Sequence, residues 1–306
     1  MKIVFLENVK LSPVQKSELS KFSSVEFYKS STPAECKDRV KDADVVVVDW
    51  IEPNEFLEDM KRGSLLSLMS TGFAWVDTKK AKNLGVTVTN IPGYATEAVS
   101  EFLIGSLIML IRKINIAKEQ LKNRNWSKEG LEGTELKGKT LGIIGLGKIG
   151  SRVASICQVF GMRILTYNRS PLNQKNIKDV KLDELLEQSD VICVTCSVNE
   201  TSKDLLNKTR LNLLKKDAVV LASTWDIIDI DALTKKMLKN EIAGVAIDVA
   251  YEGKRPILPK GLLKLNNAIL TPHIAYNTSE SEKRRIEVCL DNIRAFVKGK
   301  PKNIVS

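Results

Sequence analysis

Three glycines lie at a spacing that suits phosphate binding. A run that reads TLGIIGLGKIG places G-x-G-x-x-G at Gly145, Gly147 and Gly150. The run joins an apolar strand pattern to an apolar helical pattern, which is the context in which this spacing indicates a dinucleotide site. Gly145 would make the tight turn, Gly147 would let the backbone approach a pyrophosphate, and Gly150 would let helix and strand pack closely. The start of the helix, at Lys148 and Ile149, would point N–H groups at the phosphates.

The end of the next strand predicts the type of ribose. An NAD site usually has Asp or Glu there, to bind the ribose 2′-hydroxyl. Here the strand ends in Tyr167-Asn168-Arg169-Ser170, without an acid. Arg169 could pair with a 2′-phosphate and Ser170 could donate a hydrogen bond to it, whereas a carboxylate would repel it. We therefore expect NADP(H) in preference to NAD(H), with Asn168, Arg169 and Ser170 at the cofactor. The alternative is that Arg169 is only a solvent-facing loop cation.

Composition limits the class of protein. The chain has 306 residues, 43% hydrophobic and 27% charged, which suggests about two globular domains. We find no run near the roughly 18 apolar residues of a membrane helix and no signal-peptide pattern. Five scattered cysteines fit a reducing compartment. We therefore expect a cytoplasmic protein that does not bind membranes.

The net charge of +10 allows several interpretations. The 47 basic residues are spread along the chain without a dense block, which favours a solvated lysine-rich surface over a nucleic-acid site. Cys193 and Cys196 form C-x-x-C, but on a strand they would point to opposite faces, and with one histidine in the chain no zinc site is expected.

Strand-like and helical segments alternate along most of the chain, which predicts parallel sheets with helices on their faces. In the first part the expected strands are 2–6, 45–49, 65–70 and 86–89, and the expected helices are 12–20, 33–41, 55–61 and 77–84. A turn at 90–95 precedes one long helix over 96–123. The second series has strands 140–144, 163–167, 191–195, 218–222, 244–247 and 268–270, with helices 149–160, 182–187 and 230–238.

The last expected helix, 279–297, leaves too little chain for a third domain, so we expect it to return to the first one. The sequence thus predicts an α/β protein with two doubly wound Rossmann-like domains, one inserted into the other. The boundaries are 1–95 plus 278–306 for a split, flavodoxin-like domain that binds substrate, and 96–277 for the NAD(P)-binding domain.

Over nearly its whole length the chain resembles the D-isomer-specific 2-hydroxyacid dehydrogenase family. The resemblance is carried by STGF at 70–73, VTVTNIPG at 86–93, VSE at 99–101, the glycine motif, FGM at 160–162, GVAIDV at 244–249 and TPHIA at 271–275. It implies hydride transfer between nicotinamide and a 2-oxo or 2-hydroxy acid in a cleft between the domains. It also implies a homodimer built largely on the 96–123 helix.

The family usually uses a histidine, a glutamate and an arginine. His273, the only histidine, matches the first, and an imidazole that titrates near pH 7 suits proton transfer. The alternative is a structural histidine at a strand end. Glu252 lies one residue before the position of the glutamate, which Gly253 occupies, so Glu252 is a candidate that needs a rebuilt loop. Asp248 matches an aspartate that the family places near the nicotinamide amide.

The arginine is missing, since its position falls on Thr224 or, with a slip of one residue, on Trp225. Neither side chain makes a bidentate contact with a carboxylate. Lys254 or Arg255 could replace it. The resemblance also places the backbone amides of Gly72 and Phe73 at the substrate carboxylate.

Tryptophans follow three of the expected strands. Trp50, Trp75 and Trp225 lie at carboxyl ends of strands, which face the binding crevice in such sheets, and Tyr94 lies in the Pro-Gly turn. Our hypothesis is an aromatic-walled pocket for a substrate bulkier than usual. The alternative is that these side chains only pack at loop bases.

Two functions follow. The first is an NADP(H)-preferring oxidoreductase acting on CH–OH donors, with His273 as general acid and base and an altered specificity. The second is a nucleotide-sensing or scaffold protein that keeps the dinucleotide site without efficient catalysis.

Overall fold

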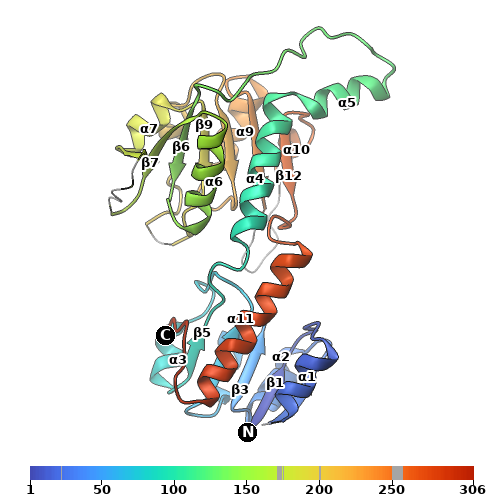
Figure 1. The fold of residues 1–306 in the computed structure, drawn as a ribbon, viewed down its shortest axis with the longest axis vertical. Helices are drawn as coiled ribbons and strands as arrows, with labels where there is room; N and C mark the ends of the chain where they lie inside the picture. The colour runs from blue at the N-terminus through green and yellow to red at the C-terminus, as the bar shows by residue number, and fades with distance from the viewer. Residues whose placement is uncertain (22, 171–173, 175, 200, 250–257) are drawn as a thin grey trace. The chain divides into compact units, whose positions relative to one another are not determined.

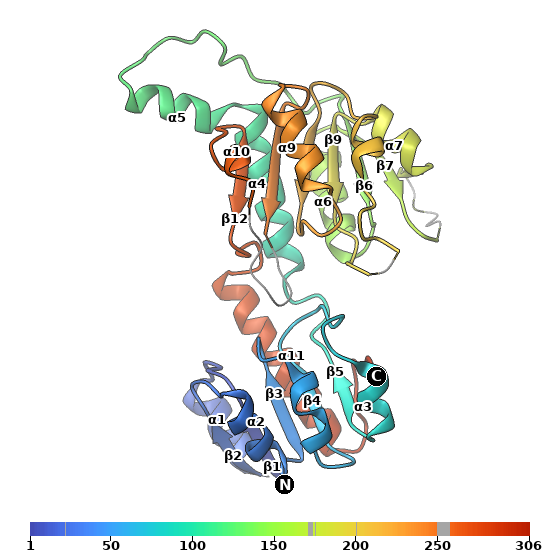
Figure 2. The same ribbon diagram turned by 180° about the vertical axis from the view of Figure 1, so that it is seen from behind.

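A computed structural model describes residues 1–21, 23–170, 174, 176–199, 201–249 and 258–306. The chain divides into two compact units, Met1–Ala95 with Ser279–Ser306, and Thr96–Thr278. Each unit holds one parallel sheet, of five strands in the first and seven in the second (Figures 1 and 2). The predicted α/β, doubly wound class is confirmed. Within the described residues, no helix is long and apolar enough to cross a membrane.

The first unit has the strand order β2-β1-β3-β4-β5, which is the flavodoxin-like order. Its strands are β1 (Lys2–Phe5), β2 (Ser24–Phe27), β3 (Val45–Val48), β4 (Leu65–Leu68) and β5 (Thr87–Thr89), and its helices are α1 (Pro13–Ser20), α2 (Pro33–Val40), α3 (Thr78–Asn83) and α11 (Ser279–Val297). All residues of β3 and β4 are buried, as expected for central parallel strands covered on both faces.

Helices cover both faces of this sheet. Cys36 and Val40 of α2 and Ala81 of α3 belong to one core cluster with alternate residues of β1, β3, β4 and β5. The C-terminal helix α11 returns to this unit as predicted, and Cys289 Sγ lies 3.7 Å from Ser67 Oγ of β4. It packs beside α1, where Gln15 donates a hydrogen bond to Glu287.

The second unit has the strand order β12-β11-β10-β9-β6-β7-β8, the arrangement of a dinucleotide-binding sheet. Its strands are β6 (Thr140–Ile144), β7 (Arg163–Tyr167), β8 (Lys178–Asp179), β9 (Val191–Val194), β10 (Val219–Ala222), β11 (Gly244–Asp248) and β12 (Ala268–Thr271), and its helices are α4 (Thr96–Ile111), α5 (Ile114–Lys122), α6 (Lys148–Val159), α7 (Leu182–Gln188), α8 (Lys208–Leu211), α9 (Ile230–Leu238) and α10 (Lys260–Leu263). Helices α4 and α6 cover one face of the sheet, while α7 and α9 lie on the other (Figures 1 and 2).

The prediction of one continuous helix over 96–123 is wrong. Helix α4 ends at Ile111, and α5 begins at Ile114 after Lys113, whose φ of 51° is left-handed. The carbonyl of Ile111 accepts instead from the backbone N–H of Thr134. A Cβ on Gly133 would lie 2.7 Å from that same carbonyl oxygen, so the close approach of this loop requires glycine. As a result α5 buries none of its residues, and it projects from the unit (Figure 1).

The predicted helix 55–61 is also wrong. The segment forms two 3₁₀ turns, η1 (Pro53–Glu55) and η2 (Leu57–Asp59), closed by bonds from Phe56 to Pro53 and from Asp59 to Phe56. Phe56 and Leu57 are buried, but adjacent apolar residues do not form the stripe of an α-helix. Strand β2 was not predicted, because a four-residue edge strand with two apolar residues gives little periodic signal. The short elements β8, α8 and α10 were missed for the same reason.

Candidate functional site

The glycine motif lies where the strand order of the second unit reverses. Strand β6 pairs with β7 on one side and β9 on the other, and this reversal is the place where such sheets bind ligands. Helix α6 begins within the motif, at Lys148, with Gly147 as its N-cap residue and Gly150 in its first turn.

The three glycines differ in what surrounds them. Gly145 has a φ of 95°, and a Cβ there would lie 2.6 Å from the backbone of Cys196. A Cβ on Gly150 would lie 2.5 Å from the carbonyl oxygen of Gly145, which Thr195 also holds through a hydrogen bond of 2.7 Å. A Cβ on Gly147 would meet nothing within 4 Å. The loop is therefore packed tightly against the sheet on one side and open at Gly147.

The start of α6 supplies hydrogen-bond donors beside this opening. The backbone N–H of Ser151 bonds back to the carbonyl of Gly147, so the N–H groups of Lys148, Ile149 and Gly150 precede the first helical bond. They carry the positive end of the helix dipole. Donors, charge and open space together fit the pyrophosphate of a dinucleotide.

Asn168 holds the glycine loop in place. Its Oδ1 accepts from the backbone N–H of Leu146 at 2.6 Å, and its Nδ2 donates to Thr166 Oγ1 at 3.1 Å. The sequence interpretation put Asn168 at the cofactor, which stays a prediction; the structure shows that its side chain supports the glycine loop. Arg169 and Ser170, which follow it, are exposed.

His273 lies two residues after the end of β12, in a strained backbone. Its φ is 54°, in the left-handed region that a residue with a side chain seldom adopts. The imidazole is half-buried, and its ring meets the ring of Tyr276 edge-on at a centroid distance of 5.2 Å. Burial lowers the pKa of His273 below its usual value, while the negative charge of Asp248 acts in the opposite direction.

Asp248 fixes the loop that carries His273. Its side chain is buried and accepts three hydrogen bonds, from Thr271 Oγ1 at 2.7 Å and from the backbone N–H groups of Ile274 and Ala275 at 2.8 Å. The resemblance implied a place near the nicotinamide amide for this aspartate. Here these three bonds make it the anchor of the histidine loop. The sequence interpretation missed this role, although Asp248 lies in the GVAIDV motif and Thr271 in the TPHIA motif.

The expected arginine position carries no cation. Thr224 is buried, with its Oγ1 3.3 Å from Asp226 Oδ2, and Trp225 packs half-buried against the core of its own unit. The packing of Trp225 against this core favours the interpretation that it only packs at a loop base. The candidates Glu252, Lys254 and Arg255 lie outside the described residues.

The remaining candidates lie in the first unit. Gly72 and Phe73 are exposed after β4, and the carbonyl of Gly72 accepts from Ser70 Oγ at 2.7 Å and Trp75 Nε1 at 3.1 Å. Trp75 packs against the core and Tyr94 is buried, so neither is a free aromatic wall. Trp50 differs, because its side chain is 54% exposed.

Replacing two of the glycines by alanine should separate binding from folding. Gly150→Ala should lower the free energy of unfolding by about 1–3 kcal/mol, because its Cβ meets the carbonyl of Gly145. Gly147→Ala should leave stability within about 0.5 kcal/mol but weaken NADPH binding at least about tenfold, by filling the opening. Chemical denaturation and calorimetric titration measure these effects. Unchanged NADPH affinity in Gly147→Ala would contradict the assignment of the opening.

Comparisons with known proteins agree with this geometry. The family model described as "D-isomer specific 2-hydroxyacid dehydrogenase, NAD binding domain" matches residues 104–275. A glyoxylate reductase of Aeropyrum pernix is 32% identical, with 94% of this chain and 91% of that protein covered. A hydroxypyruvate reductase of Blautia hydrogenotrophica is 31% identical, with 88% and 86% covered.

Solved structures extend the likeness to both units. An acyclic imino acid reductase in complex with NADPH and D-Arg has a TM-score of 0.91 and 28% identity, with 100% of both chains covered. A D-lactate dehydrogenase from Aquifex aeolicus, complexed with NAD and lactic acid, has a TM-score of 0.88 and 28% identity, with 98% and 96% covered. The chain therefore belongs to the D-isomer specific 2-hydroxyacid dehydrogenase family of NAD(P)-dependent oxidoreductases.

Proposed function

We propose that this protein is an NADPH-preferring reductase of 2-oxo acids, or of related carbonyl compounds, with His273 as its general acid and base. The observation that carries the proposal is the pairing, in one unit, of an open glycine loop with a half-buried histidine on an anchored loop. Family membership supports the reaction class. Glyoxylate and hydroxypyruvate reductases are among its relatives.

The chain's own residues have separable tasks. A bound nicotinamide supplies the hydride in reduction and takes it back in oxidation. His273 donates a proton to the carbonyl oxygen as it becomes a hydroxyl, and accepts that proton in the reverse direction. The hydrogen bonds of Asp248 fix the backbone that follows His273, and thereby the position of its imidazole. The charge of Asp248 favours the protonated ring.

The position of the missing arginine governs specificity. Thr224 and Trp225 offer no bidentate grip on a carboxylate, and one charge-stabilising donor is often worth about 100- to 1000-fold in rate. Small 2-oxo acids should therefore react slowly. The structural likeness to an imino acid reductase favours a second candidate, reduction of a 2-imino acid, in which the same hydride addition gives an amine.

Turnover is the direct test of the activity. Purified protein is mixed with NADPH and a panel of small, aromatic and cationic 2-oxo acids, with and without ammonia, and the absorbance of the reduced nicotinamide is followed. We expect oxidation of NADPH by some of these, and a fall of about 100- to 10,000-fold in His273→Ala with unchanged NADPH affinity. Tight NADPH binding without turnover across the panel would contradict the proposal and favour the nucleotide sensor or scaffold.

Arg169 should decide between the two cofactors. It is exposed two residues after the end of β7, in the run Tyr167-Asn168-Arg169-Ser170 that contains no acid, and the similar imino acid reductase was solved in complex with NADPH. Arg169→Ala should raise the KM for NADPH at least about tenfold and leave the KM for NADH unchanged. Arg163→Ala, an exposed arginine at the other end of the same strand, is the matched control. Equal effects on both cofactors would argue against a contact with the phosphate.

The pH dependence should report His273. Because burial lowers its pKa below 6.5, kcat/KM for reduction should fall as pH rises through that lowered pKa, while oxidation rises over the same range. Asp248→Asn removes the charge that opposes burial, so both profiles should move to lower pH, with a lower kcat because the bond to Ala275 is lost. Asp217→Asn, at an exposed site, is the control. A profile that moves to higher pH would contradict this account.

We also propose the homodimer through residues 96–123. Helix α5 buries none of its residues, and its Ile114 and Leu121 are 45% and 51% exposed. An apolar stripe on a projecting helix supports burial against a second copy.

A further inference from the structure

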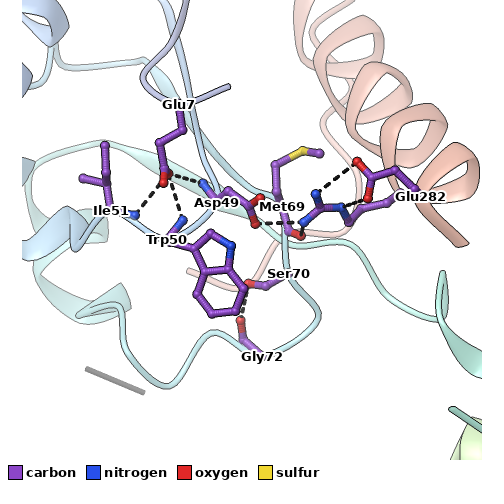
Figure 3. A network of polar contacts seen from close by, with 9 residues as sticks. Glu7, Asp49, Trp50, Ile51, Met69, Ser70, Gly72 and Glu282 are labelled. Atoms are coloured by element: carbon purple, nitrogen blue, oxygen red, sulfur yellow. Dashed lines mark hydrogen bonds and ion pairs between the residues drawn. The ribbon is translucent and has the colours of Figure 1, made fainter. Parts of the chain in front are cut away.

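The point at which the strand order reverses in the first unit is filled by a side chain. The reversal falls between β1 and β3, and sheets of this order bind anionic ligands there. Glu7 follows β1, and its Oε2 accepts the backbone N–H groups of Asp49, Trp50 and Ile51 at 2.7, 2.8 and 3.1 Å (Figure 3). Three successive N–H groups that converge on one oxygen form the kind of backbone nest that holds phosphates.

A buried arginine fixes the same segment from its other side. Arg285 of α11 pairs with Asp49 at 2.8 Å, and the two side chains are 10% and 16% exposed. It also donates to the carbonyl of Met69 at 3.3 Å and binds Glu282 through two nitrogens, at 2.7 and 3.1 Å. Burial alone would lower the pKa of Arg285, but Glu282 and Asp49 raise it above its usual value, so the cation persists. Arg285 therefore joins the residues after β3 to those after β4.

These bonds hold the backbone of the loops after β3 and β4, but they leave the aromatic side chains of these loops exposed to solvent. The carbonyl of Gly72 is held by Ser70 and Trp75, as described above. Trp50 nevertheless stays 54% exposed and Phe73 39% exposed. Exposed aromatic groups on an immobilised backbone lose little entropy on contact with a ligand.

We propose that Glu7 and Arg285 are positioning residues that fix a substrate wall made of the Trp50 side chain and the Gly72–Phe73 backbone. Glu7 places a carboxylate where a related sheet would bind a ligand's phosphate. By accepting the three N–H groups of the nest, this carboxylate holds the backbone of residues 49–51 in one conformation. The inference rests on the proposed function, since it assigns the wall to the 2-oxo or 2-imino acid. Both residues act through the wall and set substrate affinity, and neither takes part in hydride or proton transfer.

Glu7→Ala tests the role of the Glu7 carboxylate. The loss of three hydrogen bonds should raise the KM for the best substrate of the panel about 10- to 100-fold, with kcat and NADPH affinity unchanged. Added formate or acetate should lower that KM again, and Glu7→Gln, which keeps an acceptor oxygen, should retain most of the affinity. An unchanged KM, or a parallel loss of kcat and NADPH affinity, would overturn the proposal.

Two arginines of the same helix give a matched test. Arg294 pairs with Glu18 of α1 at 2.8 Å and with Asp291 of its own helix, so these two bonds hold it away from the loops after β3 and β4. Arg285→Met and Arg294→Met should both lower stability, and only Arg285→Met should raise KM. Equal rises in KM would mean that general loosening of α11 is the cause, and the proposal would fail.

One further readout does not depend on turnover. Amide hydrogen exchange at residues 49–51 should accelerate in Glu7→Ala and slow again with formate, and unchanged exchange would contradict the role of Glu7. If the wild-type protein shows no turnover, the proposed function itself is contradicted. If the wild-type protein is active and Glu7→Ala has an unaltered KM, only the positioning role of Glu7 is contradicted.

Discussion

Backbone N–H groups arranged to receive an anion are the feature on which the account of both units depends. In the second unit, the turn at Gly145 and the start of α6 leave such groups beside open space at Gly147, and close packing at Gly150 keeps them there. In the first unit, a comparable nest at the same topological point holds the carboxylate of Glu7. The same physical device thus suits a cofactor in one sheet and stiffens a loop in the other.

His273, the group proposed as general acid and base, lies on a second fixed loop. This histidine has a positive φ, and its loop is held by Asp248, whose two carboxylate oxygens both accept hydrogen bonds from the 271–275 segment. Burial and this charge act on the pKa of His273 in opposite directions, and burial has the larger effect. In the proposed function, Thr224 and Trp225 affect the grip on substrate, whereas the phosphate loop and the histidine keep their roles. On this proposal, a family member would keep its reaction and change its substrate.

The sequence predicted the parts of this molecule that repeat a strong local pattern. Buried strands 140–144 and 163–167 and helices 230–238 and 279–297 coincide with the structure, because each has a clear period and a clear end. The break at Lys113 was not predictable, since it depends on a bond from Thr134, twenty-one residues on. Trp75 and Trp225 could not be told from Trp50 by position alone, because only packing separates them. The bonds of Asp248 and Glu7 needed the fold, since their partners lie 23 to 44 residues away.

The most direct test of the central claim follows the hydride itself. NADPH carrying deuterium at the transferred C4 position is incubated with the protein and the substrates of the panel, and the products are examined by mass spectrometry and NMR. The account predicts a product with one deuterium on its former carbonyl or imine carbon. Bound NADPH that passes no deuterium to any substrate of the panel would contradict it.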